Sequence, residues 1–428
     1  MNELAVELNR ALEGTVVAAL FSDFGRRIYF PKGIVAQSAE AGKQAHRLNA
    51  TIGIATSAGQ AMHLAAIRDR FLGLTPNEIF AYAPTAGAPA LREAWKKEML
   101  DKNPALGGKL FSLPTVVAGL THGIAVAAEL FAGKGDAVLM PDMCWDNYRL
   151  IFEDRLQCRV QTFPFYTGSG GLAVDALRAG LEGLGTARAV VLLNFPNNPT
   201  GYSPSPAEAR AILEALAGRA RAGQKILALF DDAYFGLFYE EGVHRQSLFA
   251  DAADLHENLL AVKVDGPTKE NLVWGFRVGF LTFAGKALTE RHHEALGQKV
   301  MGAIRATVSN CSQPAQSLML QAMRDPGYAA QKQEAFGVLA ARYRRARALA
   351  APAPAVMRAL PFNSGYFMTF ELAKGSAERL RQLLLQEYGV GTIALGDRHL
   401  RVAYSSVDED RLEELYTTIF QAAQKLAR

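Results

Sequence analysis

Short apolar runs alternate with amphipathic segments between about residue 115 and residue 285. The runs consist of aliphatic and β-branched residues with turn residues at both ends, which predicts strands. In the amphipathic segments the apolar residues recur every three or four positions, which predicts helices. Strand candidates are 115–119, 136–141, 158–165, 187–196, 225–232, 258–266 and 277–283, and helix candidates are 123–133, 146–156, 173–184 and 205–223. This alternation predicts an α/β fold with a mainly parallel central sheet flanked by helices.

The pattern changes after about residue 325. A long helical stretch is followed by shorter strands and a closing helix, which is typical of a smaller α+β domain. We expect the two chain ends to form this small domain together. The predicted division is an N-terminal segment of the small domain at 1–60, a large ligand-binding domain at 61–325 and a C-terminal small domain at 326–428.

Composition narrows the classes of function. The chain has 428 residues, half of them hydrophobic, and a formal net charge of +4, with no dense run of lysine and arginine. No apolar run is long enough to span a bilayer, and Glu3, Glu7 and Glu13 interrupt the N-terminal apolar positions. We therefore expect a cytoplasmic protein without a signal peptide, and no nucleic-acid or membrane partner.

Metal and nicotinamide chemistry have little support in the sequence. Cys144, Cys158 and Cys311 lack metal-ligand spacing, and their odd number argues against a disulfide framework. The segment 168–171, GSGG, lacks the glycine spacing of a dinucleotide-binding turn. We expect no metal site.

Polar or aromatic residues follow several predicted strands, at the edge where ligands bind in such sheets. Gly119, Leu120 and Thr121 form a small-residue turn into a helix, which suits a phosphate, although many such turns bind nothing. Trp145 is either a core residue or a platform for a ring. Asn198 lies in an Asn-Pro-Thr-Gly turn, and its amide could serve the turn or a ligand oxygen.

The next strand ends bring charged groups. Asp231 and Tyr234 follow one strand, and a buried aspartate requires a cation or several donors. Lys269 and Arg277 are eight residues apart in the glycine-rich turn before the last strand, whereas Lys263 alternates with apolar residues inside a strand. One ligand accounts for a lysine, a carboxylate, an aromatic plate and a phosphate turn together, namely pyridoxal phosphate.

In their order and spacing, these motifs resemble a known family. Asn198 in NPTG, Asp231 with Tyr234, and Lys269 with Arg277 match the fold-type I pyridoxal-phosphate-dependent aminotransferases of class I/II, which include aspartate and aromatic aminotransferases. The resemblance covers nearly the whole chain. It implies pyridoxal 5′-phosphate as the cofactor and an aminotransferase as the activity.

The resemblance also implies a role for each matching residue at the cofactor ring. Lys269 would form the Schiff base with the aldehyde and move the proton between the substrate Cα and C4′ of the cofactor. Asp231 would pair with the pyridinium nitrogen, Tyr234 and Asn198 would bind the phenolic oxygen, and Trp145 would stack on the ring.

The same resemblance assigns the phosphate. Arg277, Thr121 and the backbone of Gly119 and Leu120 would bind it, and Thr268 would add a hydroxyl. Tyr82, in the segment 82–87, would reach the phosphate of the neighbouring subunit. A homodimer with shared active sites follows from that likeness.

Substrate binding is implied at three further positions. Arg401 would bind the α-carboxylate, and Gly53 would let the backbone approach the substrate. Arg305 would come from the partner subunit and bind the distal carboxylate of aspartate or glutamate. Alternatively, Arg305 pairs with an acid or a phosphate near the dimer interface.

Two positions depart from the family pattern. Gly266 stands where the family usually has a serine of the Schiff-base loop, so one phosphate hydroxyl is missing. Cys311 and Ser312 replace the usual prolines after Ser309 and Asn310, which affects the expected position of Arg305.

We expect an aminotransferase that moves an amino group from a dicarboxylic or aromatic L-amino acid to a 2-oxo acid such as 2-oxoglutarate. The same constellation also serves carbon–sulfur lyases, decarboxylases and cyclopropane-forming synthases, because fold and cofactor do not determine which Cα bond breaks. A non-catalytic sensor is a third class, although the fold pattern begins too early in the chain to leave room for a winged helix.

Overall fold

The computed structural model describes residues 1–29 and 33–427. Residues 30–32 and 428, which belong to the segments 1–60 and 326–428 predicted for the small domain, lie outside the described residues.

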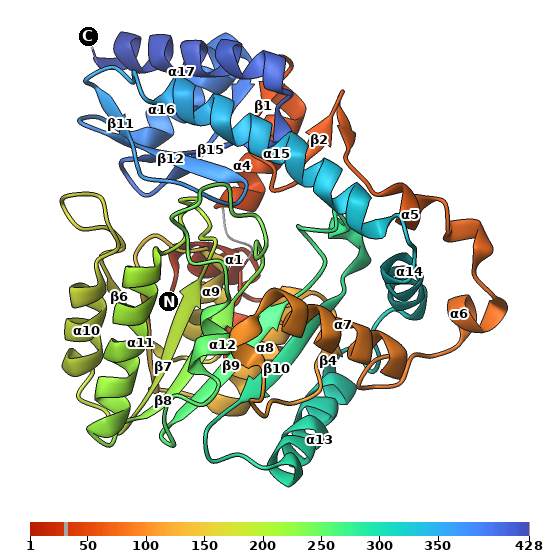
Figure 1. The fold of residues 1–428 in the computed structure, drawn as a ribbon. Coiled ribbons are helices and arrows are strands. Elements are labelled where there is room, and N and C mark those ends of the chain that lie inside the picture. The colour runs from red at the N-terminus through yellow and green to blue at the C-terminus, as the bar shows by residue number, and fades with distance from the viewer. Residues whose placement is uncertain (30–32, 428) are drawn as a thin grey trace.

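A seven-stranded sheet forms the centre of the molecule (Figure 1). Its strand order is β4-β10-β9-β8-β7-β5-β6, and only the pairings of β10 with β4 and β9 are antiparallel. The mainly parallel α/β fold expected from the alternating pattern is confirmed. The strands are β4 (Thr115–Val117), β5 (Ala137–Pro141), β6 (Arg159–Phe163), β7 (Arg188–Asn194), β8 (Lys225–Asp231), β9 (Leu259–Asp265) and β10 (Gly279–Ala284).

Helices cover both faces of this sheet because its strands are apolar on both sides. In β9, Val262 and Val264 pack in the core that contains α8 and α13, whereas Ala261 packs in the core of the opposite face. The opposite face carries α7, α10, α11 and α12. The helices are α7 (Pro89–Lys102), α8 (Leu120–Phe131), α10 (Val174–Gly183), α11 (Pro206–Arg221), α12 (Leu248–Ala252), α13 (Glu290–Thr307) and α14 (Gln313–Met323).

The helix predicted over 146–156 differs from the simple expectation. A single turn, α9 (Asn147–Arg149), continues into a π-helix, η3 (Leu150–Arg155). The N–H of Leu156 donates to the carbonyl of Ile151 at 3.3 Å, which is the wider five-residue spacing of that helix type. Apolar periodicity alone does not distinguish this winding from an α-helix.

The C-terminal part of the chain builds a four-stranded antiparallel sheet in the order β11-β12-β15-β14. Strand β1 (Leu48–Asn49) pairs in parallel with β13, and Leu48 belongs to the same core as Phe370 and Leu415. The predicted domain boundaries remain a prediction. The elements are α15 (Tyr328–Ala350), β11 (Met357–Ala359), β12 (Phe367–Leu372), α16 (Ala377–Tyr388), β13 (Val390–Gly391), β14 (Ile393–Leu395), β15 (His399–Ala403) and α17 (Leu412–Ala427).

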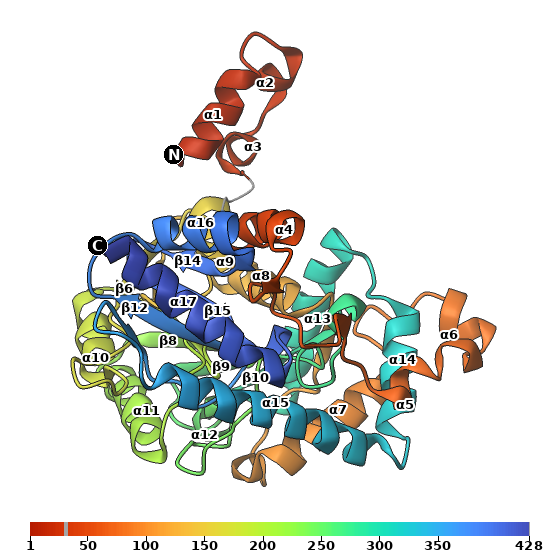
Figure 2. The same ribbon diagram turned by 90° about the horizontal axis from the view of Figure 1, so that it is seen from above.

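The first three helices stand apart from the rest of the molecule (Figure 2). They are joined to it through Asp154, whose backbone oxygen accepts from Arg27 Nε at 3.2 Å and whose carboxylate accepts from Tyr29 Oη at 3.2 Å. The remaining N-terminal elements are α1 (Glu3–Ala11), α2 (Val16–Leu20), α3 (Asp23–Arg27), α4 (Ile34–Gln44), β2 (Thr56–Ser57), β3 (Gln60–Ala61), α5 (Ala65–Arg68) and α6 (Pro76–Phe80).

Candidate active site

A cavity of about 320 Å³ opens where the small antiparallel sheet meets the carboxyl edge of the central sheet. It collects most of the side chains that the sequence singled out, from the ends of β7 and β8, the loop after β9, the start of α8, and strands β12 and β15. Its lining is Ile34, Gly53, Leu120, Thr121, Trp145, Tyr148, Asn194, Asn198, Asp231, Ala233, Tyr234, Thr268, Lys269, Arg277, Phe367 and Arg401.

Lys269 places its amine in this cavity. The amine donates to the carbonyl of Gly53 at 3.2 Å and lies 5.1 Å from the centre of the Tyr234 ring. Burial lowers the pKa of the amine to about 8, and the nearby guanidinium groups of Arg277 and Arg401 act in the same direction. A substantial fraction of the amine is therefore neutral, and nucleophilic, near neutral pH.

Gly53 brings its backbone next to this amine. A Cβ atom at position 53 would lie 3.5 Å from Lys269 Nζ and 3.4 Å from the ring of Phe367. A side chain here would fill the space beside the amine, so glycine keeps that space open to a ligand.

Asp231 ends β8 with a carboxylate that is almost completely buried. Tyr148 Oη donates to its Oδ2 at 2.5 Å, and the backbone N–H of Ala233 donates to its Oδ1 at 3.0 Å. Burial raises the pKa of Asp231 to about 6, although both hydrogen bonds favour the ionised form. The result is a carboxylate that is ionised at neutral pH and has few partners, which suits a cationic ring nitrogen.

Asn194 connects this carboxylate to the NPTG turn. Its side chain donates to the backbone oxygen of Asp231 at 2.7 Å and accepts from the backbone N–H of Asn198 at 2.8 Å. Asn194 is the last residue of β7 and Asp231 is the last residue of β8, and the two are register partners in neighbouring strands. The two side chains are therefore close to each other at the same edge of the sheet.

The turn from β4 into α8 forms a cradle for an anion. Gly119 has a φ of +80°, and a Cβ atom there would lie 2.3 Å from Arg277 Nη2. The first N–H groups of α8 have no partners within the helix, as at any helix N-terminus. Among the described residues, the buried hydroxyl of Thr268 has no hydrogen-bond partner. A guanidinium, a hydroxyl and helix N–H groups together can bind a phosphate.

Gly266 has a steric explanation in this structure. A Cβ atom at position 266 would lie 3.0 Å from the Cα of Gly279 and 3.0 Å from the carbonyl of Val278. The loop after β9 packs directly against the start of β10 and leaves no room for the serine of the family pattern.

Arg401 is buried, and its partners leave it able to bind an acid. Nη1 donates to Asn198 Oδ1 at 2.9 Å, and Nη2 donates to the carbonyl of Thr51 at 2.9 Å. The ring of Phe367 lies 4.2 Å from the guanidinium carbon. Within the described chain no carboxylate forms a salt bridge with Arg401, and its Nε has no acceptor. Burial lowers the pKa of Arg401 to about 10, so the side chain remains a cation.

Three predicted site residues do not line this cavity: Gly119, which belongs to the anion cradle, and Tyr82 and Arg305. Tyr82 is 91% exposed, and Arg305 is an exposed residue of α13 whose Nη1 donates to Ser309 Oγ at 2.6 Å. The segments that carry Tyr82 and Arg305 are in contact, since Asn310 Nδ2 donates to the carbonyl of Ala83 at 2.8 Å. Their predicted contribution to the site of a partner subunit remains a prediction.

Sequence reasoning missed five residues of the cavity wall: Ile34, Tyr148, Asn194, Ala233 and Phe367. Asn194 had a usable signal, because it is the polar end of an apolar strand. Tyr148 is 83 residues from Asp231 in sequence, and no local pattern indicates that contact.

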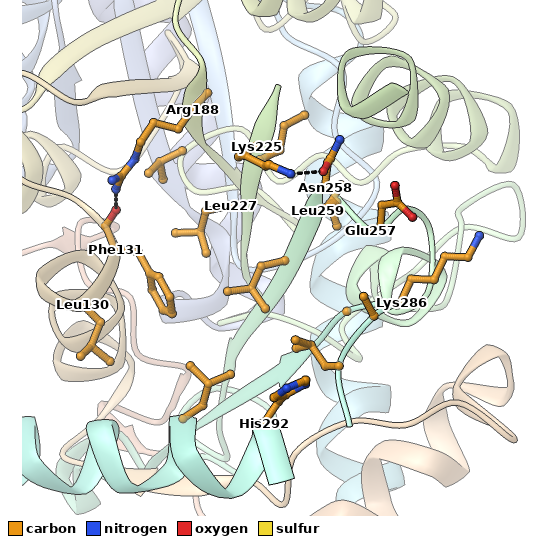
Figure 3. Close-up of a pocket in the computed structure, with 18 of the residues that line it drawn as sticks. Leu130, Phe131, Arg188, Lys225, Leu227, Glu257, Asn258, Leu259, Lys286 and His292 are labelled. Carbon is orange, nitrogen blue, oxygen red and sulfur yellow. Dashed lines mark hydrogen bonds between the residues drawn. The ribbon is translucent and has the colours of Figure 1, made fainter. Parts of the chain in front are cut away.

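A larger cavity of about 870 Å³ opens at the other edge of the sheet (Figure 3). Leu227 and Leu259, from the beginnings of β8 and β9, form part of its apolar floor, and Arg188, Lys225 and Lys286 lie around it. None of the predicted site residues lines it. Among residues 1–29 and 33–427, no helix is both long and apolar enough to cross a bilayer, and no His, Cys, Asp or Glu cluster could hold a metal ion.

Comparisons with known proteins agree with this geometry. A probable N-acetyl-LL-diaminopimelate aminotransferase of Bacillus subtilis is 26% identical over 215 residues, which is 50% of this chain and 49% of that protein. A probable aspartate/prephenate aminotransferase of Aquifex aeolicus is 26% identical over 254 residues, or 57% of each chain. The matches therefore span only about half the length of these curated relatives.

A solved aminotransferase of Anaerococcus prevotii has the same fold, with a TM-score of 0.82 and 22% identity over 94% of this chain and 98% of that one. The family model described as aminotransferase class I and II matches residues 38–419. On the strength of that match across most of its length, the chain belongs to the aminotransferases of class I and II.

Proposed function

We propose that this protein is a pyridoxal-phosphate-dependent aminotransferase that moves the amino group of an L-amino acid to a 2-oxo acid. The observation that carries the proposal is the shared cavity of Lys269, Asp231 and Arg401, in which a partly neutral amine, a buried carboxylate and a guanidinium without an acidic partner face one space. An amine for the aldehyde, an anion for the ring nitrogen and a cation for the substrate carboxylate are the groups this chemistry needs.

The residues present fit the cofactor. The cradle of Gly119, Arg277 and α8, with the partnerless hydroxyl of Thr268, suits the phosphate. Trp145 lines the cavity and offers an aromatic face to the ring. When bound, pyridoxal phosphate supplies an electron sink that makes the Cα proton of an amino acid acidic.

Asp231 and Lys269 handle charge and protons in this proposal. Asp231, held by Tyr148 and the N–H of Ala233, stays ionised above about pH 6 and keeps a proton on the ring nitrogen. Lys269, with its pKa near 8, is suited to take the proton from the substrate Cα and return it at C4′. Both groups line one cavity because β8 and β9 are adjacent strands.

Arg401 binds the α-carboxylate of the substrate in the proposal. Asn198 and the carbonyl of Thr51 hold its two terminal nitrogens, so the planar fork is fixed before a carboxylate arrives. Pre-organisation of this kind reduces the entropy lost on binding.

For the substrate class, we propose dicarboxylic or aromatic amino acids as donors and 2-oxoglutarate or a similar acid as acceptor. Arg305 of the partner subunit would bind the distal carboxylate in a homodimer. The aspartate/prephenate name of the Aquifex relative supports this class. Arg305 holds Ser309 within its own chain, so a structural role for it is the alternative.

The first test is the absorbance spectrum of the protein purified with pyridoxal phosphate, for wild type and for Lys269→Ala. We expect a band near the border of the visible and ultraviolet in the wild type that the variant lacks. Lys286→Ala, at an exposed lysine far from the cavity, is the control and should retain the band.

Aspartate, glutamate, phenylalanine and alanine are then added singly. Conversion to the pyridoxamine form with particular donors supports the transaminase and identifies the donor class. Binding without conversion, together with release of pyruvate or ammonia without a 2-oxo acid, would replace the transaminase by a lyase. No binding would reject both.

A further inference from the structure

A buried ion cluster lies directly behind Asp231. We call Lys263, Asp232 and Asp265 the lysine cluster. Lys263 is 1% exposed, its amine bonds to Asp232 Oδ2, and it lies 3.1 Å from Asp265 Oδ2. Counted with every group ionised, one cation and two carboxylates give the cluster a formal charge of −1 in the protein interior, although burial raises the pKa of Asp265. Such a group stabilises a fold weakly, so a function for it is worth testing.

The surroundings of the cluster hold each carboxylate in place. Ser247 Oγ donates to Asp232 Oδ2 at 2.5 Å, and Trp95 Nε1 lies 3.2 Å from both carboxylate oxygens of Asp265. The ring of Phe235 lies 4.9 Å from the Lys263 amine. Serine, tryptophan and phenylalanine are all neutral, so among the described residues Lys263 is the cation that pairs with both acids.

The cluster and the cavity share the end of β8. Asp231 and Asp232 are consecutive, and their side chains lie on opposite faces of the sheet. Lys263 and Val264 are the partners of Phe230 and Asp231 in β9, and the N–H of Asp232 donates to the carbonyl of Val264 at 2.9 Å. Any movement of Asp232 toward a new partner would therefore move Asp231.

We propose that Lys263 is a positioning residue for the proposed transamination, because by balancing Asp232 and Asp265 it fixes the end of β8 and keeps Asp231 ionised. The inference rests on the proposed function. The groups that face Asp231 itself are Tyr148, Tyr234, Lys269 and the N–H of Ala233, and the negative charge of Asp232 acts through the strand end. Without Lys263, that charge would be unbalanced one residue away.

The test compares four holoenzymes: wild type, Lys263→Met, Asp232→Asn and the double variant. The double variant keeps the cluster at a net charge of −1. We expect Lys263→Met to lower kcat about tenfold or more with little change in KM, and to move the acidic side of the kcat profile to higher pH. The pH midpoint of the cofactor absorbance should move the same way. Adding Asp232→Asn should reverse most of both changes.

Lys225→Met, at the exposed first residue of β8, is the control and should behave as wild type.

Equal impairment of Lys263→Met and the double variant, with no shift in either pH profile, would show a packing role and overturn the proposal. If Lys263→Met does not fold, Asp232→Asn alone tests the proposal. Removing the negative charge of Asp232 should move the pH midpoint of the cofactor absorbance to lower pH. An unchanged midpoint would overturn the proposal.

A wild type that binds no pyridoxal phosphate would reject the proposed function separately. The cluster is then tested by urea unfolding of the cofactor-free protein between pH 4 and pH 8. Asp232→Asn should lower the pH at which Asp231 loses its proton, and identical pH profiles would overturn the proposal.

Discussion

At the scale of one residue, the buried carboxylate of Asp231 suits the proposed cofactor but lowers the stability of the folded chain. Its pKa is raised from 3.8 to about 6 because burial penalises the charged form. Below about pH 4 the group is protonated in both folded and unfolded chains and costs nothing. As pH rises from 4 to 6, the folded chain holds the proton more tightly than the unfolded chain, so stability falls.

Asp231→Asn should therefore stabilise the cofactor-free protein while reducing turnover. The shift corresponds to about 3 kcal/mol in the free energy of unfolding above pH 6, as an upper value, and to no gain at pH 4. Urea unfolding at pH 4 and pH 8 measures it. Turnover should fall about 100-fold or more with the cofactor still bound. A stability gain that is the same at both pH values would contradict the assignment of the shift to this carboxylate.

Lys269 allows a second prediction at the same scale. The pKa of its amine is lowered to about 8, so the neutral fraction increases through that pH rather than near 10.5. Only the neutral amine attacks an aldehyde. The rate at which cofactor-free protein recovers its absorbance band with pyridoxal phosphate should rise between pH 7 and pH 9 and then level off. The reference is free Nα-acetyl-lysine, whose rate should still be rising at pH 9. Parallel curves for both would show an unperturbed lysine.

At the scale of elements, the anion cradle depends on the approach of the β4–α8 turn to β10. Glycines make that approach possible on both sides, since a Cβ atom on Gly279 would lie 2.9 Å from the carbonyl carbon of Gly119. The guanidinium of Arg277 fills the space that a side chain at position 119 would take. The cradle is therefore a backbone feature that side-chain substitution can destroy.

Gly119→Ala should separate this steric role from simple backbone strain. Gly135 is the matched control, because its φ of +85° is similar to the +80° of Gly119 but a Cβ atom there meets nothing within 4 Å. Gly119→Ala should cost about 1–3 kcal/mol of stability, because a φ of +80° with a ψ of 169° is a conformation that glycine alone adopts readily. Gly135→Ala should cost about 1–2 kcal/mol through its positive φ. Only Gly119→Ala should weaken pyridoxal-phosphate binding, about tenfold or more, as measured by titration of the absorbance band. Equal affinities in both variants would show that Arg277 relocates without loss.

Elements also show what the sequence could and could not predict. The alternation of apolar runs with amphipathic segments predicted the strands and the helices on both faces of the sheet. Parallel strands are buried on both faces, so their sequences are almost continuously apolar and easy to identify. Residues at the strand ends, such as Asp231 and Asn198, could be predicted from their position alone. The bond from Tyr148 and the pairing of Lys263 with Asp232 could not, because they depend on sheet order and on which face each residue takes.

At the scale of the whole molecule, the exposed positions of Tyr82 and Arg305 become meaningful in a homodimer. Both lie outside the cavity of their own chain, on segments that the bond from Asn310 to Ala83 joins. If Arg305 binds the distal carboxylate in the partner's site, Arg305→Ala should cost about 2–5 kcal/mol toward aspartate. That is roughly 30-fold to several-thousand-fold in kcat/KM, with a smaller loss toward phenylalanine.

Subunit mixing tests that arrangement directly. Lys269→Ala and Arg305→Ala chains are each expected to be nearly inactive toward aspartate. After co-refolding, a heterodimer has one site with Lys269 from one chain and Arg305 from the other. With random pairing, aspartate activity should recover to about a quarter of the wild-type value. No recovery, with the heterodimer shown by native mass spectrometry, would show that Arg305 does not act in the partner's site.

The π-helix Leu150–Arg155 has a consequence for the history of this chain. A π-helix of this kind holds one residue more than an α-helix over the same path, and it begins two residues after Tyr148. Deleting one residue between Tyr148 and Phe152 would rotate Tyr148 by about 100° relative to the buried Phe152. The hydroxyl would leave Asp231, and no compensating point mutation nearby would return it. Among homologues we therefore expect insertions and deletions to avoid Leu150–Arg155, even though Glu153 and Arg155 are exposed.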